Sequence, residues 1–198
     1  MSDEAEHSGR KVLAKAKIAA VLAILIIGGI AGYFFYHDYA EGIVTLSIID
    51  PPSAQPGNSL HYNSSILHIY VRFSEIDIHQ VGLGTTNSTG WYSVVGSPVT
   101  VDMISVLNAP RTLGSANLAT GTYDQVRFPV STVIVTISMV GNVTYSIPSD
   151  LLRVSITGGG FQSSAGVRAN LLLTVSFSNS EILAMNGRLT PHATATLT

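Results

Sequence analysis

Cysteine is absent from this sequence of 198 residues. Thiol nucleophiles, thiolate zinc sites and disulfide bonds are therefore all excluded. Secreted animal and fungal β domains of this size often carry a disulfide, so the absence favours a bacterial or archaeal origin.

Charge is scarce as well. Asp, Glu, Lys and Arg make up 11% of the residues and the net charge is −2, whereas soluble globular proteins have roughly 25% charged residues. The chain lacks the basic field that nucleic-acid binding requires, so we expect no nucleic-acid partner.

Lysine is confined to one end of the chain. All three lysines lie within the first 17 residues, and the later basic residues are six arginines between Arg72 and Arg188. The remainder is rich in Ser, Thr, Val, Ile, Leu, Gly and Asn, a composition that suits β structure.

The longest uncharged run covers residues 18–35 and reads IAAVLAILIIGGIAGYFF. About 20 apolar residues cross a bilayer as a helix, because only a helix satisfies its own backbone hydrogen bonds there. Arg10 and the lysines precede the run, and no Lys or Arg follows before Arg72. The positive-inside rule therefore predicts three parts: a cytoplasmic N-terminus (1–17), a single transmembrane helix in the lipid bilayer (18–36) and an extracytoplasmic domain (43–198).

Two other interpretations of this run stay open. It resembles a cleaved signal peptide, although it exceeds the usual apolar core of 7–15 residues. It also allows a pilin-type leader, cut before a helix that packs into a filament, although Asp50-Pro51-Pro52 would end such a helix early. Gly28 and Gly32 have the GxxxG spacing at which membrane helices approach closely, but glycine is common in such helices.

The rest of the chain reads as short β-rich segments separated by turn residues. Residues 67–73 alternate between apolar and polar, which predicts a half-buried strand. The alternation shifts phase at Ser74-Glu75, which predicts a bulge or kink. Asp102 precedes a segment that we expect to form one helical turn with Asp102 as its N-cap. About ten strands with hardly any helix predict an all-β fold, a β-sandwich.

Five segments lie in a recognisable order across roughly residues 66–198. They are Ile69–His79, Gly90-Trp91, Ser97–Asp102, Gly121-Thr122-Tyr123-Asp124-Gln125-Val126-Arg127, which is the most specific, and Leu189-Thr190-Pro191. Together they resemble the DUF4382 family, a domain of unknown function in bacterial and archaeal surface proteins. The resemblance implies a prealbumin-like or immunoglobulin-like sandwich and no established reaction.

Few residues have a spacing that indicates chemistry. Asp77 and His79 lie two residues apart on one predicted strand face, so they are weak candidates for metal ligands; the alternative is an exposed polar face. Glu75 and Asp77 are likewise candidates for paired carboxylates, or surface acids. The sequence has no G-x-S-x-G elbow, no dinucleotide-binding glycine pattern and no H-E-x-x-H. We therefore expect no catalytic residue, no enzyme activity and no cofactor.

Three N-glycosylation sequons begin at Asn63, Asn87 and Asn142. Each falls in a predicted loop or turn, where a glycosyltransferase reaches it. We expect all three asparagines at the surface and N-linked glycan on at least one.

These features predict a single-pass cell-membrane protein with an extracytoplasmic β domain. The leading hypothesis is a structural or interaction protein of the cell surface, or an accessory subunit of an envelope complex, whose partners are other envelope or membrane proteins. A ligand- or metal-binding surface module and a pilin-like filament subunit are the alternatives.

Overall fold

The computed structural model describes residues 21–35, 41–50, 62–82, 90–149 and 151–198. The chain divides into two compact units, Met1–Ala40 and Glu41–Thr198.

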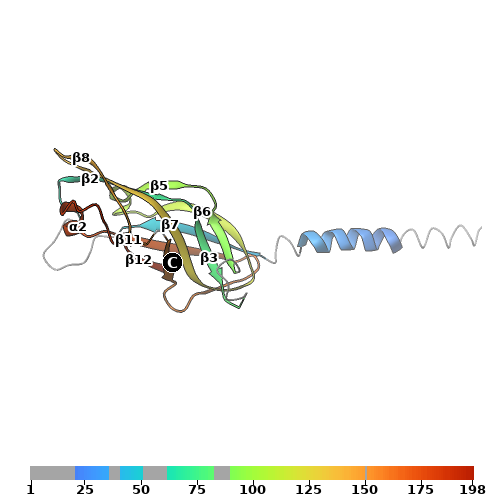
Figure 1. Cartoon of the computed structure of the whole chain (residues 1–198). Helices are drawn as coiled ribbons and strands as arrows, with labels where there is room; N and C mark the ends of the chain where they lie inside the picture. Colours follow the sequence, from blue (N-terminus) through green and yellow to red (C-terminus); the bar gives the residue numbers. More distant parts are fainter. Residues whose placement is uncertain (1–20, 36–40, 51–61, 83–89, 150) are drawn as a thin grey trace, which may run out of the picture. The chain divides into compact units, whose positions relative to one another are not determined.

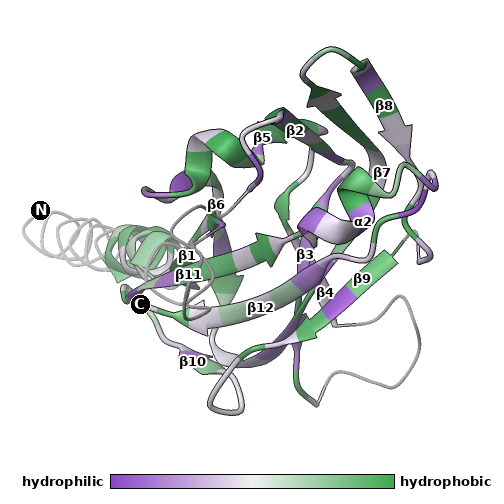
Figure 2. Ribbon diagram, turned by 90° about the vertical axis from the view of Figure 1, so that its left-hand side faces the viewer, coloured by the Kyte–Doolittle hydropathy of each residue, from purple (hydrophilic) through white to green (hydrophobic). Residues whose placement is uncertain are grey.

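The first unit contains a helix over residues 21–35, and every one of these residues is exposed. Figure 2 shows the hydrophobic character of this helix. None of the helices in the described segments has the length and apolarity needed to cross a bilayer. The expected span, 18–36, extends past both ends of the described helix, and Arg10 and the three lysines lie outside the described residues.

The second unit is all-β, as expected, with twelve described strands (Figure 1). One 3-10 helix and one short α-helix accompany them. The elements are β1 (Glu41–Ile49), β2 (Ile66–Phe73), β3 (Ile76–Gln80), β4 (Trp91–Val95), β5 (Val99–Asp102), η1 (Met103–Val106), β6 (Arg111–Ala119), β7 (Gly121–Ile137), β8 (Gly141–Tyr145), β9 (Leu151–Ser155), β10 (Phe161–Ser163), β11 (Arg168–Ser176), α2 (Asn179–Leu183) and β12 (His192–Leu197).

The smaller sheet has four strands in the order β12-β11-β1-β6. β1 pairs in parallel with β11 and antiparallel with β6, so the first strand of the domain lies inside this sheet. Buried and half-buried residues alternate along all of β1. One face of the sheet therefore packs on the core, and the other faces outward.

The larger sheet is organised around β7, which is 17 residues long. The first half of β7 pairs with β3 on one side and with β9 and β10 on the other; its second half pairs with β2 and β8. The order β4-β3-β7-β2-β5 completes the sheet of eight strands. Figure 1 shows β7 running through the domain and ending in the β7–β8 hairpin.

A single hydrophobic core contains side chains from both sheets. Val44, Leu46 and Ile48 of β1 contribute from the smaller sheet, and Phe73 and Phe128 contribute from the larger one; all five are at most 1% exposed. The rings of Phe73 and Phe128 meet edge to face, with centroids 5.8 Å apart. This shared core holds the outward faces of both sheets in place.

The sheets also approach each other at their edges. At one edge Thr157 N–H donates to the Ala195 carbonyl of β12 (2.8 Å). At the other edge a Cβ on Gly114 of β6 would lie 3.0 Å from the Val94 carbonyl oxygen of β4. Glycine is therefore needed where β6 passes β4.

Several local predictions are confirmed. β2 buries Ile69, Val71 and Phe73, and the chain breaks at Ser74-Glu75 before β3 begins. Leu67, which the alternation also placed on the buried face, is exposed. Asp102 has extended backbone dihedrals and accepts a hydrogen bond from the Ile104 N–H, as expected of the N-cap of η1.

Two sequence patterns do not match the strands that form. Residues 123–130 and 133–138 read in the sequence as two strands, but residues 123–137 belong to one long strand, β7, which continues through an irregularity between its two halves. Gly158-Gly159-Gly160 reads in the sequence as a hairpin turn. All three glycines have positive φ, but β9 and β10 both pair with β7 and not with each other.

Candidate functional site

The outward face of the larger sheet carries a group of polar and aromatic side chains, here called the tryptophan cluster. It crosses four strands, from β4 through β3 and β7 to β9. Its members are Asp77, His79, Trp91, Asp124, Arg127 and Arg153.

The centre of the cluster is an ion pair between β3 and β7. Asp77 lies directly opposite Arg127 in the antiparallel register. Both Nε and Nη2 of Arg127 lie 2.8 Å from Asp77 Oδ2. The Asp77 side chain is 6% exposed and that of Arg127 is 20% exposed, so the pair is largely withdrawn from water. Because a lone buried charge is costly, each partner needs the other.

The indole of Trp91 covers this ion pair. The guanidinium carbon of Arg127 lies 4.5 Å from the ring centroid, and that of Arg153 lies 5.7 Å away. Arg127 and Arg153 are direct cross-strand neighbours and repel each other. The indole face and the Asp77 carboxylate offset that repulsion.

His79 joins the cluster through a bulge in β7. His79 lies opposite Gln125 and Gln80 lies opposite Tyr123, so Asp124 is the extra residue on β7. The bulge turns Asp124 outward. Its Oδ1 lies 2.8 Å from His79 Nδ1, and the imidazole also contacts Trp91, with centroids 4.9 Å apart.

Gly90 sets the approach of β4 to β3. Its φ is +85°, and an added Cβ would lie 3.1 Å from the Gln80 carbonyl and 3.3 Å from His79 Nε2. The Gly90 carbonyl accepts a hydrogen bond from Gln80 N–H (2.7 Å). Glycine is therefore required immediately before Trp91.

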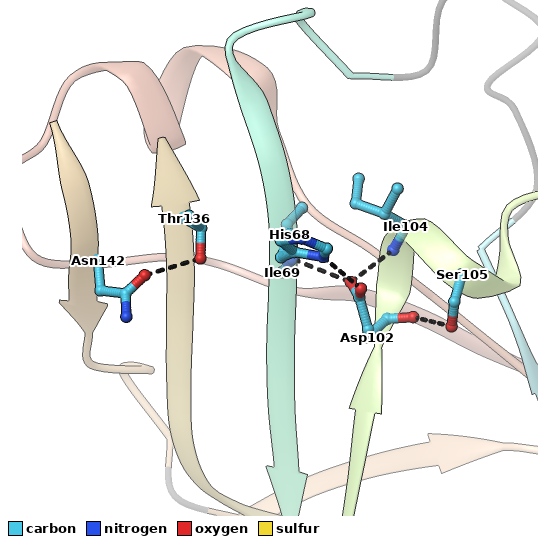
Figure 3. A network of polar contacts seen from close by, with 7 residues as sticks. All are labelled: His68, Ile69, Asp102, Ile104, Ser105, Thr136 and Asn142. Atoms are coloured by element: carbon cyan, nitrogen blue, oxygen red, sulfur yellow. Dashed lines mark hydrogen bonds and ion pairs between the residues drawn. The ribbon is translucent and has the colours of Figure 1, made fainter. Parts of the chain in front are cut away.

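A second polar group lies farther along the same face (Figure 3). His68 Nδ1 lies 2.7 Å from Asp102 Oδ2, while Asp102 Oδ1 accepts from the N–H groups of Ile69 and Ile104. The His68 ring stacks on Tyr70 with centroids 5.3 Å apart. Asp102 thus caps η1 and holds β2 against the end of β5.

The structure does not support the hypothesis of a metal site at Asp77 and His79, because among the residues it describes it places no third ligand beside them. Asp77 and His79 do share a face, as expected, but Asp77 binds Arg127 and His79 binds Asp124. The described segments contain no group of three or more His, Cys, Asp or Glu residues arranged to hold a metal ion. Glu75 is exposed in the break between β2 and β3 whereas Asp77 is buried, so they are not a carboxylate pair.

A His–Asp pair is also found in the Ser-His-Asp triad of nucleophilic enzymes, which would need a hydroxyl beside His68 or His79. In the described segments, each imidazole has its aspartate as hydrogen-bond partner and no serine or threonine hydroxyl. Figure 3 shows Thr136 of β7 in the row beside His68, but its hydroxyl donates to Asn142 Oδ1 (2.8 Å). The geometry therefore provides no activated nucleophile at either imidazole.

Two of the three sequons can be placed. Asn63 is exposed in a turn, where its Oδ1 accepts hydrogen bonds from the N–H and hydroxyl of Ser65 (3.0 and 2.8 Å). Asn142 is exposed in β8, not in a turn as expected. Asn87 lies outside the described residues.

A buried acid that sequence reasoning missed lies at the end of β1. Asp50 is 0% exposed, and Tyr62 Oη donates to its Oδ2 at 2.5 Å. The same Tyr62 oxygen accepts from Phe177 N–H (3.3 Å). Burial raises the pKa of Asp50 to about 7, while the Tyr62 hydrogen bond acts in the opposite direction. Burial also raises the pKa of Tyr62, and the nearby Asp50 charge adds to this.

Three of the five segments that carried the family resemblance meet in the tryptophan cluster. Asp77 and His79 come from the first, Trp91 from the second, and Asp124 and Arg127 from the most specific one. A family model described as a domain of unknown function, DUF4382, matches residues 41–188. The chain belongs to the DUF4382 family. No curated protein and no solved structure matches it.

Within this DUF4382 domain, the specific segment has a structural explanation. Tyr123 is 0% exposed and stacks on Phe161, with centroids 5.6 Å apart. Arg127 binds Asp77, and Asp124 binds His79. Sequence reasoning missed the roles of Asp124, Arg127 and Arg153, although an arginine on a strand of mostly apolar residues is a signal for a buried acidic partner.

Proposed function

We propose that this DUF4382 protein is a membrane-anchored, non-catalytic protein of the cell surface whose β domain acts by contact with other envelope proteins. The observation that carries the proposal is the closure of the candidate site on itself. Asp77 binds Arg127, His79 binds Asp124, and His68 binds Asp102. An active site needs convergent polar groups free to meet a substrate, and these groups meet one another instead.

Membrane anchoring is part of the proposal. The described helix is apolar and exposed throughout, and it belongs to a unit separate from the β domain. An exposed apolar helix is costly in water and favourable in lipid. The basic residues before it and their absence up to Arg72 favour a cytoplasmic N-terminus.

The fold subtype and the glycans also belong to the proposal. Two sheets around one core support a sandwich of the prealbumin-like or immunoglobulin-like kind. Exposed Asn63 and Asn142 support N-glycosylation of the external domain. The intact mass from the native host should exceed that of the polypeptide, and Asn63→Gln with Asn142→Gln should lower it; a native mass equal to the bare chain would contradict this part.

The absence of cysteine allows a direct test of topology. Thr132→Cys places one thiol on the outward face of β7, and Ser8→Cys places one in the N-terminal segment. In intact cells a membrane-impermeant maleimide should label Thr132→Cys at once, and Ser8→Cys only after permeabilisation. The reverse order would refute the topology.

Catalysis is tested separately. Asp77→Asn keeps the shape of the side chain and removes its charge, and His79→Gln keeps a polar group of similar reach and removes the basicity of the imidazole. A substrate turnover that this double variant abolishes, while its circular dichroism spectrum is unchanged, would refute the non-catalytic proposal.

A further inference from the structure

The outward face of the smaller sheet contrasts with the outward face of the larger sheet; it is here called the hydroxyl face. Along β1 the odd-numbered residues point outward, because the even-numbered ones are buried. The registers to β6, β11 and β12 place the neighbouring outward residues beside them. The hydroxyl and amide side chains of this face are Thr45, Ser47, Thr112, Ser115, Asn117, Asn170, Thr174, Ser176, Thr194 and Thr196.

Formal charge is nearly absent from this face. Among its outward positions Glu41 and Arg168 carry one, and both lie at the same end, since Arg168 pairs with Ile43. The exposed His192, which pairs with Ser176, lies at the opposite end. Figure 2 shows β12 in the pale colours of intermediate hydropathy. Ordinary protein surfaces have roughly 25–35% charged residues, whereas depletion of charge marks the centre of a protein interface.

The face also carries aliphatic groups. Ile43, Ile49 and Leu172 point outward and are half-buried, and the threonine methyl groups lie around them. The outward positions of these four strands contain no Trp, Tyr or Phe. A polysaccharide surface usually needs aromatic rings to stack on sugars, so a protein face is the better fit.

The edges of this sheet are already in contact with the larger sheet. Thr157 binds β12, and Gly114 of β6 lies against Val94. Strand addition at either edge would displace these contacts. The flat face is therefore the surface that this sheet leaves for a partner.

Its size is sufficient for a specific interface. Four strands about 4.8 Å apart and the nine residues of β1 at about 3.3 Å each give a face of roughly 20 × 30 Å. Two such faces would bury about 1,200 Å² in total, above the roughly 1,000 Å² expected of a biological interface.

We propose that the hydroxyl face binds the hydroxyl face of a second copy of this chain. A two-fold axis brings only the residues beside it near their own counterparts, so an uncharged centre brings no like charges together. With that axis in the interface and running across the strands, Glu41 and Arg168 of one copy lie over the opposite end of the other, where His192 is exposed. The inference names the partner for the proposed contact function and is independent of membrane topology.

The test uses a matched pair of threonines in the full chain, reconstituted in lipid discs. Thr45 is central on the hydroxyl face, and Thr132 is on the outward face of the larger sheet; both are half-buried strand residues. Packed sheets lie about 10 Å apart, beyond the reach of most disulfides, so a short bismaleimide is the cross-linker. We expect Thr45→Cys to give mainly covalent dimer and Thr132→Cys to stay monomeric.

A second pair of variants distinguishes dimerisation through the hydroxyl face from dimerisation through the proposed membrane helix, where Gly28 and Gly32 could form another contact. Thr45→Glu should convert dimers to monomers by mass photometry, with at least a tenfold loss of affinity, because like charges then meet at the axis. Thr132→Glu should leave the dimer unchanged. The inference would be overturned if the unsubstituted chain is monomeric, or if the Thr45→Glu variant still forms dimers. A reversed topology in the thiol-labelling test would refute the proposed topology but would leave this inference unaffected.

Discussion

The two outward faces of the β domain have the same strand geometry but different side-chain chemistry. The larger sheet carries the charges, and they meet one another: Asp77 with Arg127, His79 with Asp124, and His68 with Asp102. The smaller sheet carries hydroxyls, amides and a few aliphatic groups. Its outward hydrogen bonds join uncharged side chains on neighbouring strands, such as Ser115 with Thr45 (3.1 Å) and Ser47 with Thr112 (3.3 Å).

The difference shows where the polar residues of this domain stabilise the fold and where they leave a surface free for a partner. Charges brought out of water must be paired, so the tryptophan cluster ties four strands together. Exposed hydroxyls lose little when they exchange water for a partner, so the hydroxyl face can be covered at small cost. Stability should therefore depend on the first face and association on the second.

The largest effect should come from the buried acid at the end of the smaller sheet. The pKa of Asp50 rises from 3.8 to about 7 on folding, so the folded chain holds a proton that the unfolded chain releases in that interval. The free energy of unfolding should therefore fall as the pH rises from about 4 to about 7, by at most about 4 kcal/mol, and stay level above. Urea unfolding, followed by the fluorescence of Trp91, measures this.

Asp50→Asn keeps the hydrogen-bond acceptor for Tyr62 and removes the titration. Its free energy of unfolding should lack the component that falls between pH 4 and pH 7. If the variant and the unsubstituted chain have the same slope, Asp50 is not the titrating group.

Breaking the central ion pair should cost somewhat less. Asp77→Ala leaves the largely buried Arg127 guanidinium without its carboxylate, and we expect a loss of about 3 kcal/mol. Arg127→Met removes the other charge of the pair and completes a double-mutant cycle with Asp77→Ala. The double variant should be more stable than the two single losses predict, because neither charge is left alone. Strictly additive losses in a urea-denaturation cycle would argue against the pairing.

Removing the indole should have a moderate effect. Trp91→Leu loses the contacts to Arg127, Arg153 and His79 and should lower stability by about 1–2 kcal/mol. Trp91→Phe keeps an aromatic face and should lose less. Thermal melts followed by far-ultraviolet circular dichroism compare the two, and equal losses would show that the aromatic face is unimportant.

The smallest effect should appear on the hydroxyl face. Ser115→Ala removes an exposed hydrogen bond to Thr45 and should change stability by less than about 0.5 kcal/mol. A loss comparable to that of Asp77→Ala would erase the proposed distinction between the two faces.

The local features of individual strands could be predicted from the sequence better than the contacts between strands. The alternation in β2, the break at Ser74-Glu75 and the cap at Asp102 depend on residues close in the chain, and the structure confirms them. The shared face of Asp77 and His79 follows from the two-residue period of a strand. These features are local, so one sequence suffices to read them.

The contacts of those elements could not be read in the same way. Arg127 meets Asp77 across 50 positions of sequence, and Asp124 reaches His79 only because β7 has a bulge opposite β3. The parallel pairing of β1 with β11 joins the two ends of the domain. Long-range register sets all three, and periodicity does not encode it.

The central claim, that one face is closed on itself and the other is covered by a partner, is tested most directly by the reactivity of single thiols. Thr45→Cys and Thr132→Cys are compared in the full chain in lipid discs, with excess monofunctional maleimide, before and after dissociation by detergent. We expect Thr132→Cys to react at one rate throughout, and Thr45→Cys to react at least tenfold more slowly until the copies separate. Equal and unchanging rates at the two positions would contradict the account.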